Sequence, residues 1–134
     1  MGLIFILIAE FLWALELILI RKFFPTQNSF VVSAVTCLFA AFFYMPVFLL
    51  QRVKFTLQDW IVLAILGFTS WFLGQLFYVT GIQRSESAVL STLAVLFLPL
   101  CALVMGAVFL KEPLTQKAII GGVFMIAGFL IISL

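Results

Sequence analysis

The sequence contains no histidine and few charged residues. Only 9% of its 134 residues are charged, whereas about a quarter of an average soluble domain is charged. It also contains no HExxH pair, no Walker loop, no nucleophile elbow and no cysteine–histidine metal set. We therefore expect a protein that is not an enzyme and that holds neither a metal nor a cofactor.

The chain also has few cysteines and a small net charge. The two cysteines, Cys37 and Cys101, each lie inside an apolar run, so they are predicted to be small packing residues and not a disulfide framework. The net charge is +2, without a dense basic patch, so nucleic acid is not an expected partner.

Apolar residues make up 66% of the chain and gather into five long runs. A bilayer core about 30 Å thick needs about 20 helical residues. Runs of roughly this length cover residues 3–20, 30–50, 60–82, 88–110 and 118–134. Lipid offers the backbone no hydrogen-bond partner, and barrel-type alternation is absent, so each run is predicted to be a helix. The sequence thus predicts an all-α integral membrane protein with five transmembrane helices, forming a single domain over residues 1–134.

The basic residues between the runs bear on orientation, because lysine and arginine collect on the cytoplasmic side. With five spans, the side of the N-terminus would hold Arg52, Lys54, Lys111 and Lys117. The opposite side would hold Arg21, Lys22 and Arg84. Four against three weakly favours an N-terminus in the cytoplasm. A near-tie is also what a protein inserted in both orientations shows, or simply what so few charges give.

Two carboxylates interrupt the first run. A carboxylate at the centre of a membrane helix costs about 2.5 kcal/mol or more and persists where it faces a cavity, a partner or a proton. Glu10 is therefore our stronger candidate for a proton or cation site, the alternative being an inert hydrogen bond across a helix interface. Glu16 lies one turn from Arg21 and Lys22 and is favoured to reach the membrane interface beside them. At 100° per residue, Glu10, Trp13 and Glu16 follow one broad side of the helix and could face a common cavity.

The third run carries a polar aromatic stripe. Trp71, Gln75 and Tyr78 recur at positions i, i+4 and i+7, and they are candidates for lining a cavity. Because tryptophan and tyrosine are also common at membrane interfaces, an interfacial role stays open. A second stripe consists of glycines and predicts close helix packing: Gly67, Gly74 and Gly81.

Proline and glycine mark the last two runs. Pro99, in the middle of the fourth, removes a backbone hydrogen bond and predicts a kink. In the fifth, Gly121, Gly122 and Gly128 give a smooth face that suits helix packing or dimerisation.

A set of residues in the second half has a recognisable spacing: Tyr78, Gly81, Ile82, Ser87, Ala88, Pro99, Phe109, Leu110, Glu112, Leu114, Thr115, Gly121 and Gly128. This stretch resembles the closing helices of an EamA-type repeat from the drug/metabolite transporter superfamily. Trp13 and Ala14, with Arg21 and Lys22, resemble the first helix of that repeat. Lys111 stands where the family usually has a glycine, and Glu86 interrupts a run that is usually of small residues.

The resemblance implies a secondary transporter of small organic solutes that works by alternating access. Members of the family carry two five-helix repeats in opposite orientation around a substrate cavity, and this chain corresponds to one repeat. A homodimer, with an antiparallel arrangement as one option, or a second five-helix chain would then complete the transporter. The more distantly similar small multidrug resistance proteins are antiparallel dimers with an essential first-helix glutamate, to which Glu10 is the nearest equivalent.

The expected partners are thus a lipid bilayer, a small-molecule substrate and a second chain, in the inner or plasma membrane of a prokaryote. The residues expected to bind substrate or protons are Glu10, Trp13, Glu16, Trp71, Gln75 and Tyr78. Two alternatives remain. One is a subunit that flips lipid carriers, which a lateral opening lined by apolar residues would favour, and the other is a membrane scaffold without transport activity.

Single cysteines introduced at Gln27 and Gln116 test the orientation. These positions lie in the first and fourth connectors, on opposite sides of the membrane in a five-span chain. Cys37 and Cys101 are replaced, and an impermeant thiol reagent is applied to intact cells, with permeabilised cells as the reference for complete labelling. Labelling of each site in a fraction of the molecules would mean that both orientations coexist, as an inverted homodimer requires. Labelling at Gln27 alone would mean one orientation, with the N-terminus inside, and would contradict an inverted homodimer.

Overall fold

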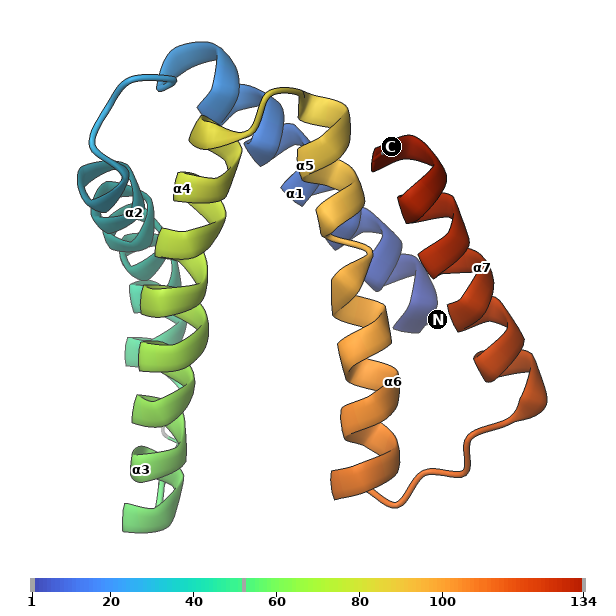
Figure 1. Ribbon diagram of the computed structural model, residues 1–134. Helices are drawn as coiled ribbons and strands as arrows, with labels where there is room; N and C mark the ends of the chain where they lie inside the picture. The colour runs from blue at the N-terminus through green and yellow to red at the C-terminus, as the bar shows by residue number, and fades with distance from the viewer. Residues whose placement is uncertain (1, 52, 134) are drawn as a thin grey trace. The chain divides into compact units, whose positions relative to one another are not determined.

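The computed structural model describes residues 2–51 and 53–133, the last of them by its backbone alone. Every regular element within these ranges is a helix (Figure 1). In chain order the elements are α1 (Gly2–Phe23), α2 (Ser29–Leu50), α3 (Leu57–Leu66), η1 (Gly67–Gly74), α4 (Gln75–Arg84), α5 (Ala88–Ala94), α6 (Phe97–Phe109) and α7 (Gln116–Ser133). The predicted all-α fold is confirmed.

Four helical stretches are long and apolar enough to cross a bilayer: Gly2–Phe23, Ser29–Leu50, Leu57–Arg84 and Ala88–Phe109. The third consists of α3, η1 and α4 in direct succession, and the fourth of α5 and α6. A shorter apolar helix, Gln116–Ile132, coincides with the fifth predicted run. The chain is a multi-pass membrane protein whose helices match the predicted runs to within a few residues.

The chain divides into two compact units, residues 1–84 and 85–134. In the first unit, α1 and α2 both pack against α4. In the second unit, α5 packs against α7. The single five-helix domain over residues 1–134 stays a prediction.

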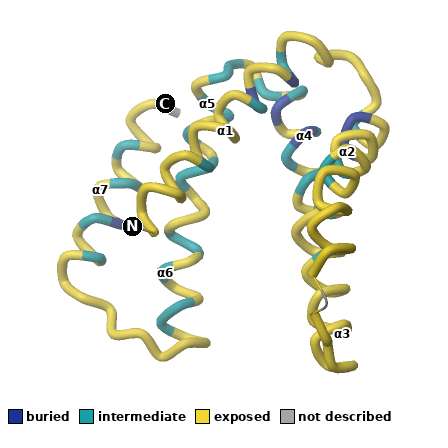
Figure 2. Tube along the Cα trace, turned by 180° about the vertical axis from the view of Figure 1, so that it is seen from behind, coloured by how far each residue is buried: buried dark blue, intermediate teal, exposed yellow. Residues whose placement is uncertain are grey.

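Most of the large apolar side chains are exposed on the surface of the protein. Along the described chain, the buried apolar side chains are Leu17, Ile20, Val32, Val79 and Ile82. Figure 2 shows the dark-blue segments of the first unit on α1, α2 and α4. Elsewhere large side chains stay exposed, as Phe42 and Phe43 on α2 do at 71% and 74%. Such surfaces suit contact with lipid tails, which are as apolar as leucine.

One glutamine fixes the loop between α1 and α2. The side-chain amide of Gln83, on α4, donates hydrogen bonds to the carbonyl oxygens of Phe24 at 2.7 Å and Gln27 at 3.1 Å. Its Oε1 accepts a hydrogen bond from Ser29 Oγ, at the start of α2, at 2.7 Å. Gln83 therefore partners groups at the ends of two helices, where the helical hydrogen-bond ladder leaves backbone groups unpaired.

Helix α3 begins with a complete N-terminal cap. Thr56 Oγ1 accepts from the Asp59 amide at 3.3 Å, and Asp59 Oδ2 accepts from the Thr56 amide at 2.8 Å, which is a capping box. The rings of Phe55 and Trp60 meet edge to face across this cap, with centroids 5.4 Å apart. The cap starts the helix at Leu57, slightly before the predicted boundary at residue 60.

The fourth span is interrupted just before Pro99, and the assignment of this break to the proline stays a prediction. A turn at Val95 and Leu96 separates α5 from α6. Proline has no amide hydrogen for the carbonyl four residues earlier, and its ring crowds that group. The Val95 carbonyl accepts instead from the Leu98 amide at 3.0 Å.

The connector after α6 contains a left-handed residue. Lys111 has a φ of 55°, the one positive φ outside glycine in the described chain. The amides of Leu110 and Glu112 both donate to the Gly106 carbonyl, at 3.0 and 3.2 Å, so the backbone turns sharply there. An L-residue is strained in this conformation because of its Cβ, and glycine is not. This is a physical reason for the glycine that the EamA-type pattern has at this position.

Replacing Lys111 with glycine should stabilise the protein by about 1 kcal/mol, because it relieves the strain of a left-handed lysine. The measurement is the thermal unfolding midpoint in detergent micelles. Lys111→Ala is the matched control, since it removes the same charge but keeps a Cβ at the left-handed position, so it should not raise the midpoint. A lower midpoint for Lys111→Gly would show that the lysine side chain itself stabilises the turn.

Candidate functional site

A polar contact joins the first and third spans. Gln75, the first residue of α4, donates from Nε2 to Oε1 of Glu16 on α1 at 2.6 Å. Both side chains are half-buried. The bond is short, as expected when the acceptor is a charged carboxylate. Within the described residues Glu16 thus has its partner on another span, and it makes no ion pair with Arg21 or Lys22.

Two aromatic residues lie beside this contact. The phenol oxygen of Tyr78 is 3.5 Å from the carbonyl oxygen of Trp13, which is too long for a strong hydrogen bond. Tyr78 is half-buried, and Trp13 is 50% exposed. We call Trp13, Glu16, Gln75 and Tyr78 the α1–α4 cluster.

Buried apolar residues lie beside this contact on both helices. Leu17 directly follows Glu16 on α1 and is 2% exposed, and Val79 on α4 is fully buried. Val79 comes four residues after Gln75, which puts both on one face of α4. The hydrogen bond between the glutamate and the glutamine therefore lies next to the buried core of the first unit.

Two of the predicted site residues lie outside the cluster. Glu10 is exposed and makes no hydrogen bond or ion pair with any described residue. Six residues turn an α-helix by about 600°, which leaves Glu10 about 120° around α1 from Glu16. Trp71 is 54% exposed and lies against α2, where its carbonyl oxygen accepts from the thiol of Cys37 at 3.6 Å.

The π-helix η1 explains why Trp71 and Gln75 do not lie on one face of the third span. In a regular α-helix, residues four apart share one face, and the sequence prediction rests on that rule. In η1, which spans Gly67–Gly74, the turns are wider because each amide bonds the carbonyl five residues earlier. The predicted stripe of Trp71, Gln75 and Tyr78 is therefore divided: the first residue contacts α2, and the other two contact α1.

The cluster can bind a proton or a cation at one carboxylate. Among the described residues, Gln75 is the one hydrogen-bond donor to Glu16, and it uses Oε1, so Oε2 has no donor. A carboxylate without a counter-ion is costly inside a bilayer, and a proton or a cation relieves that cost. Aromatic rings nearby favour a cation, which is attracted to their faces.

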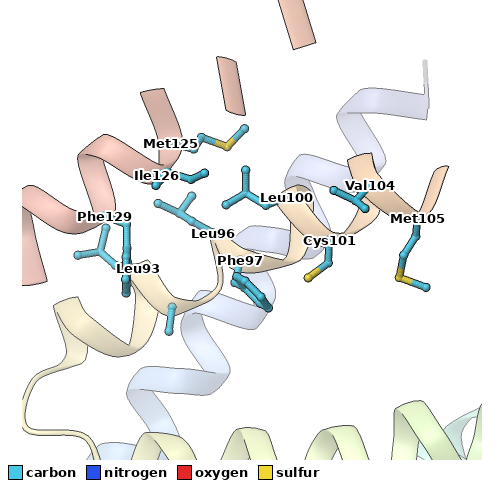
Figure 3. Close-up of a pocket in the computed structure, with 11 residues that line it drawn as sticks. Leu93, Leu96, Phe97, Leu100, Cys101, Val104, Met105, Met125, Ile126 and Phe129 are labelled. Carbon is cyan, nitrogen blue, oxygen red and sulfur yellow. The ribbon is translucent and has the colours of Figure 1, made fainter. Parts of the chain in front are cut away.

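A larger hollow lies in the second unit, between α7 and the broken helix α5–α6. It has a volume of about 780 Å³, and apolar side chains line it, among them Phe97, Leu100, Cys101, Met125 and Phe129 (Figure 3). None of the described residues in its wall is charged. We call it the apolar groove, and its lining suits a hydrocarbon chain better than a polar solute.

The sequence as a whole identifies the family. The model of the EamA-like transporter family matches residues 1–134, the full length of the chain. The chain belongs to the EamA-like transporter family. A search of curated proteins and a search of solved structures found no match. EamA-like proteins are transporters of the drug/metabolite type and not enzymes, so membership supports a general transport role.

The glycines of this EamA-like chain differ in their surroundings. Gly122 is buried, and a methyl group there would lie 3.5 Å from Leu100 Cδ2 on α6. Methyl groups at Gly121 and Gly128 would have no described atom within 4 Å. Gly122 therefore lies near Leu100 at a distance that leaves room for a methyl group, and packing through Gly121 and Gly128 stays a prediction.

Sequence reasoning missed the glutamine that fixes the first loop. Gln83 lies eight residues after Gln75, which places the two amides about 80° apart around an α-helix, within one broad face. Two amides on one face of an apolar span are a signal that α4 meets polar groups of its neighbours. The hydroxyl of Ser33 and the thiol of Cys37 gave no comparable signal, because small residues in an apolar run are usually packing residues.

Proposed function

We propose that this EamA-like protein is a secondary transporter of small organic solutes, working by alternating access in a prokaryotic cell membrane. The observation that carries the proposal is the hydrogen bond between Glu16 and Gln75, 2.6 Å long, between the first and third spans. Family membership supports transport in general. The carboxylate without a counter-ion supports coupling to a proton or a cation.

Coupling follows from competition for Glu16. The ionised carboxylate takes up either a proton or a cationic group of the solute, and release of one makes room for the other. Gln75 can donate to Oε1 in both states, because the carbonyl oxygen of a protonated acid still accepts a hydrogen bond. The amide thus keeps the acid in place while its charge changes. Glu10, the stronger proton or cation candidate from the sequence, stays a prediction that competes with this assignment, and variants of the two glutamates decide between them.

A second inverted five-helix unit completes the proposed transporter. Secondary transporters are commonly built from repeats of opposite orientation, with the binding site at the interface of the repeats. One EamA-like repeat fills this chain, and the near-equal charge count of its two sides supports insertion in both orientations. We therefore propose an inverted homodimer of this chain, with a separate five-helix chain as the alternative partner.

Glu16→Gln should reduce coupled transport to the level of empty liposomes while leaving the fold intact. Glutamine still accepts the hydrogen bond from Gln75 but cannot take up a proton. Uptake of tetraphenylphosphonium, threonine and uridine into proteoliposomes is measured under an imposed pH gradient, with pyranine inside to report proton flux.

Glu10→Gln is the matched control on the same helix and should retain uptake. If Glu16→Gln retains coupled uptake and Glu10→Gln loses it, coupling belongs to Glu10, and the role given to Glu16 is contradicted. Absence of protein-dependent uptake for all three solutes would contradict the proposed substrate class.

The apolar groove favours lipid-carrier flipping as the second candidate function. Its lining residues are apolar along α5, α6 and α7, and its volume of about 780 Å³ is large enough for a hydrocarbon chain. In this reading the groove, and not the α1–α4 cluster, holds the cargo.

Cys101→Trp separates the two functions, because the indole fills the groove. If the first proposal holds, solute uptake should be unchanged in this variant. If the groove carries lipid, the variant should lose flipping of a fluorescent short-chain polyprenyl phosphate, measured by dithionite quenching in liposomes. Val108→Trp is the control, since it adds the same ring to a position on α6 that is 66% exposed and outside the groove. Equal flipping by both variants would contradict the lipid candidate.

A further inference from the structure

A smaller pocket lies between α2 and the third span, inside the first unit. Its volume is about 260 Å³, and its walls include Phe30, Ser33 and Cys37 on α2 with Trp71 and Phe72 on η1. None of its lining residues is charged. No residue of the α1–α4 cluster is part of it, so this pocket is separate from the proposed transport site.

Aromatic rings keep this pocket open. Small residues on neighbouring membrane helices normally let the backbones approach closely, and Ser33 and Cys37 are small. Here the rings of Phe30 and Phe72 meet at the rim, with centroids 6.4 Å apart, and Phe72 stacks on Phe68 with centroids 5.6 Å apart. The wide turns of η1 present these rings and Trp71 toward α2, and space remains behind them.

Ser33 gives this apolar pocket one unused hydrogen-bonding group. The residue is 7% exposed, and its hydroxyl is the buried side-chain group that has no hydrogen-bond partner within the described chain. Other hydroxyls on these helices bond the carbonyl one turn earlier, as those of Thr36, Thr69 and Thr80 do. Leaving a buried hydroxyl unpaired is energetically costly. A ligand that bonds Ser33 recovers that cost.

We propose that this pocket binds a small, uncharged aromatic molecule with one hydroxyl or amine group that hydrogen-bonds Ser33. An apolar cavity of about 150 Å³ holds one benzene ring, so about 260 Å³ accommodates two fused rings. The absence of a charged wall residue disfavours an ion. The Ser33 hydroxyl has no hydrogen bond within the described chain that a ligand would have to replace.

The ligand enters from the bilayer. The aromatic residues at the rim are open to their surroundings, with Phe30 58%, Trp71 54% and Phe72 47% exposed. Within a membrane helix such surfaces face lipid, where uncharged aromatic molecules concentrate. The Cys37 thiol, half-buried in the pocket wall, reports occupancy because a bound ligand shields it.

Protection of Cys37 from alkylation tests the proposal. In full-length protein in liposomes, Cys101→Ala leaves Cys37 as the single thiol, and its reaction with N-ethylmaleimide is followed by intact mass. Saturating 1-naphthol should slow this reaction at least fivefold. Naphthalene lacks the hydroxyl, so it should need about tenfold more for the same protection, and Ser33→Ala should abolish that difference, as expected for one hydrogen bond.

Cys37→Ala supplies the matched control, because its remaining thiol, Cys101, lies in the apolar groove. Equal slowing at both cysteines would mean that 1-naphthol acts by dissolving in the bilayer, and it would overturn the proposal. Equal potency of 1-naphthol and naphthalene toward Cys37 would overturn it too. The thermal midpoint of Ser33→Ala without ligand should match or exceed that of the unchanged protein, because an unpaired buried hydroxyl is removed, so loss of discrimination is not loss of folding.

Discussion

The hydrocarbon core of a bilayer offers a polar group no hydrogen-bond partner, and this constraint governs the structure. It allows only helices across the bilayer, since a helix satisfies its backbone within itself. It also changes what holds helices together, because apolar side chains gain little by leaving lipid for protein. The few polar side chains on the spans therefore specify which helices meet, and the small buried core around Leu17 and Val79 lies beside one such contact.

The candidate site follows from the same constraint. Glu16 and Gln75 are each costly on a membrane helix when unpaired, and each becomes acceptable by bonding the other. A pair of this kind is stable in both charge states of the acid, which a salt bridge with lysine or arginine is not. Ser33 is an exception, because its hydroxyl is buried and has no such partner within the described residues.

Helix boundaries were predictable, and side-chain partners were not. Span length and composition are fixed by the bilayer, so the five runs were found to within a few residues. The partner of Glu16 depends on how α1 is rotated against α4, which apolar composition around both helices does not encode. The π-helix at Gly67–Gly74 depends on a shift in backbone bonding that no residue type demands. For that reason the stripe containing Trp71 was predicted on one face and is divided between two.

The hydrogen bonds of Gln83 have a consequence for the order in which this protein is made. The carbonyl groups of Phe24 and Gln27 lie 59 and 56 residues before the amide that binds them. The hairpin of the first two spans therefore leaves the ribosome with its loop still lacking these partners, and only synthesis of the third span supplies them. The first loop can form these hydrogen bonds only after the third span has been synthesised. The first unit therefore matures as a set of three spans and not as a hairpin followed by a helix.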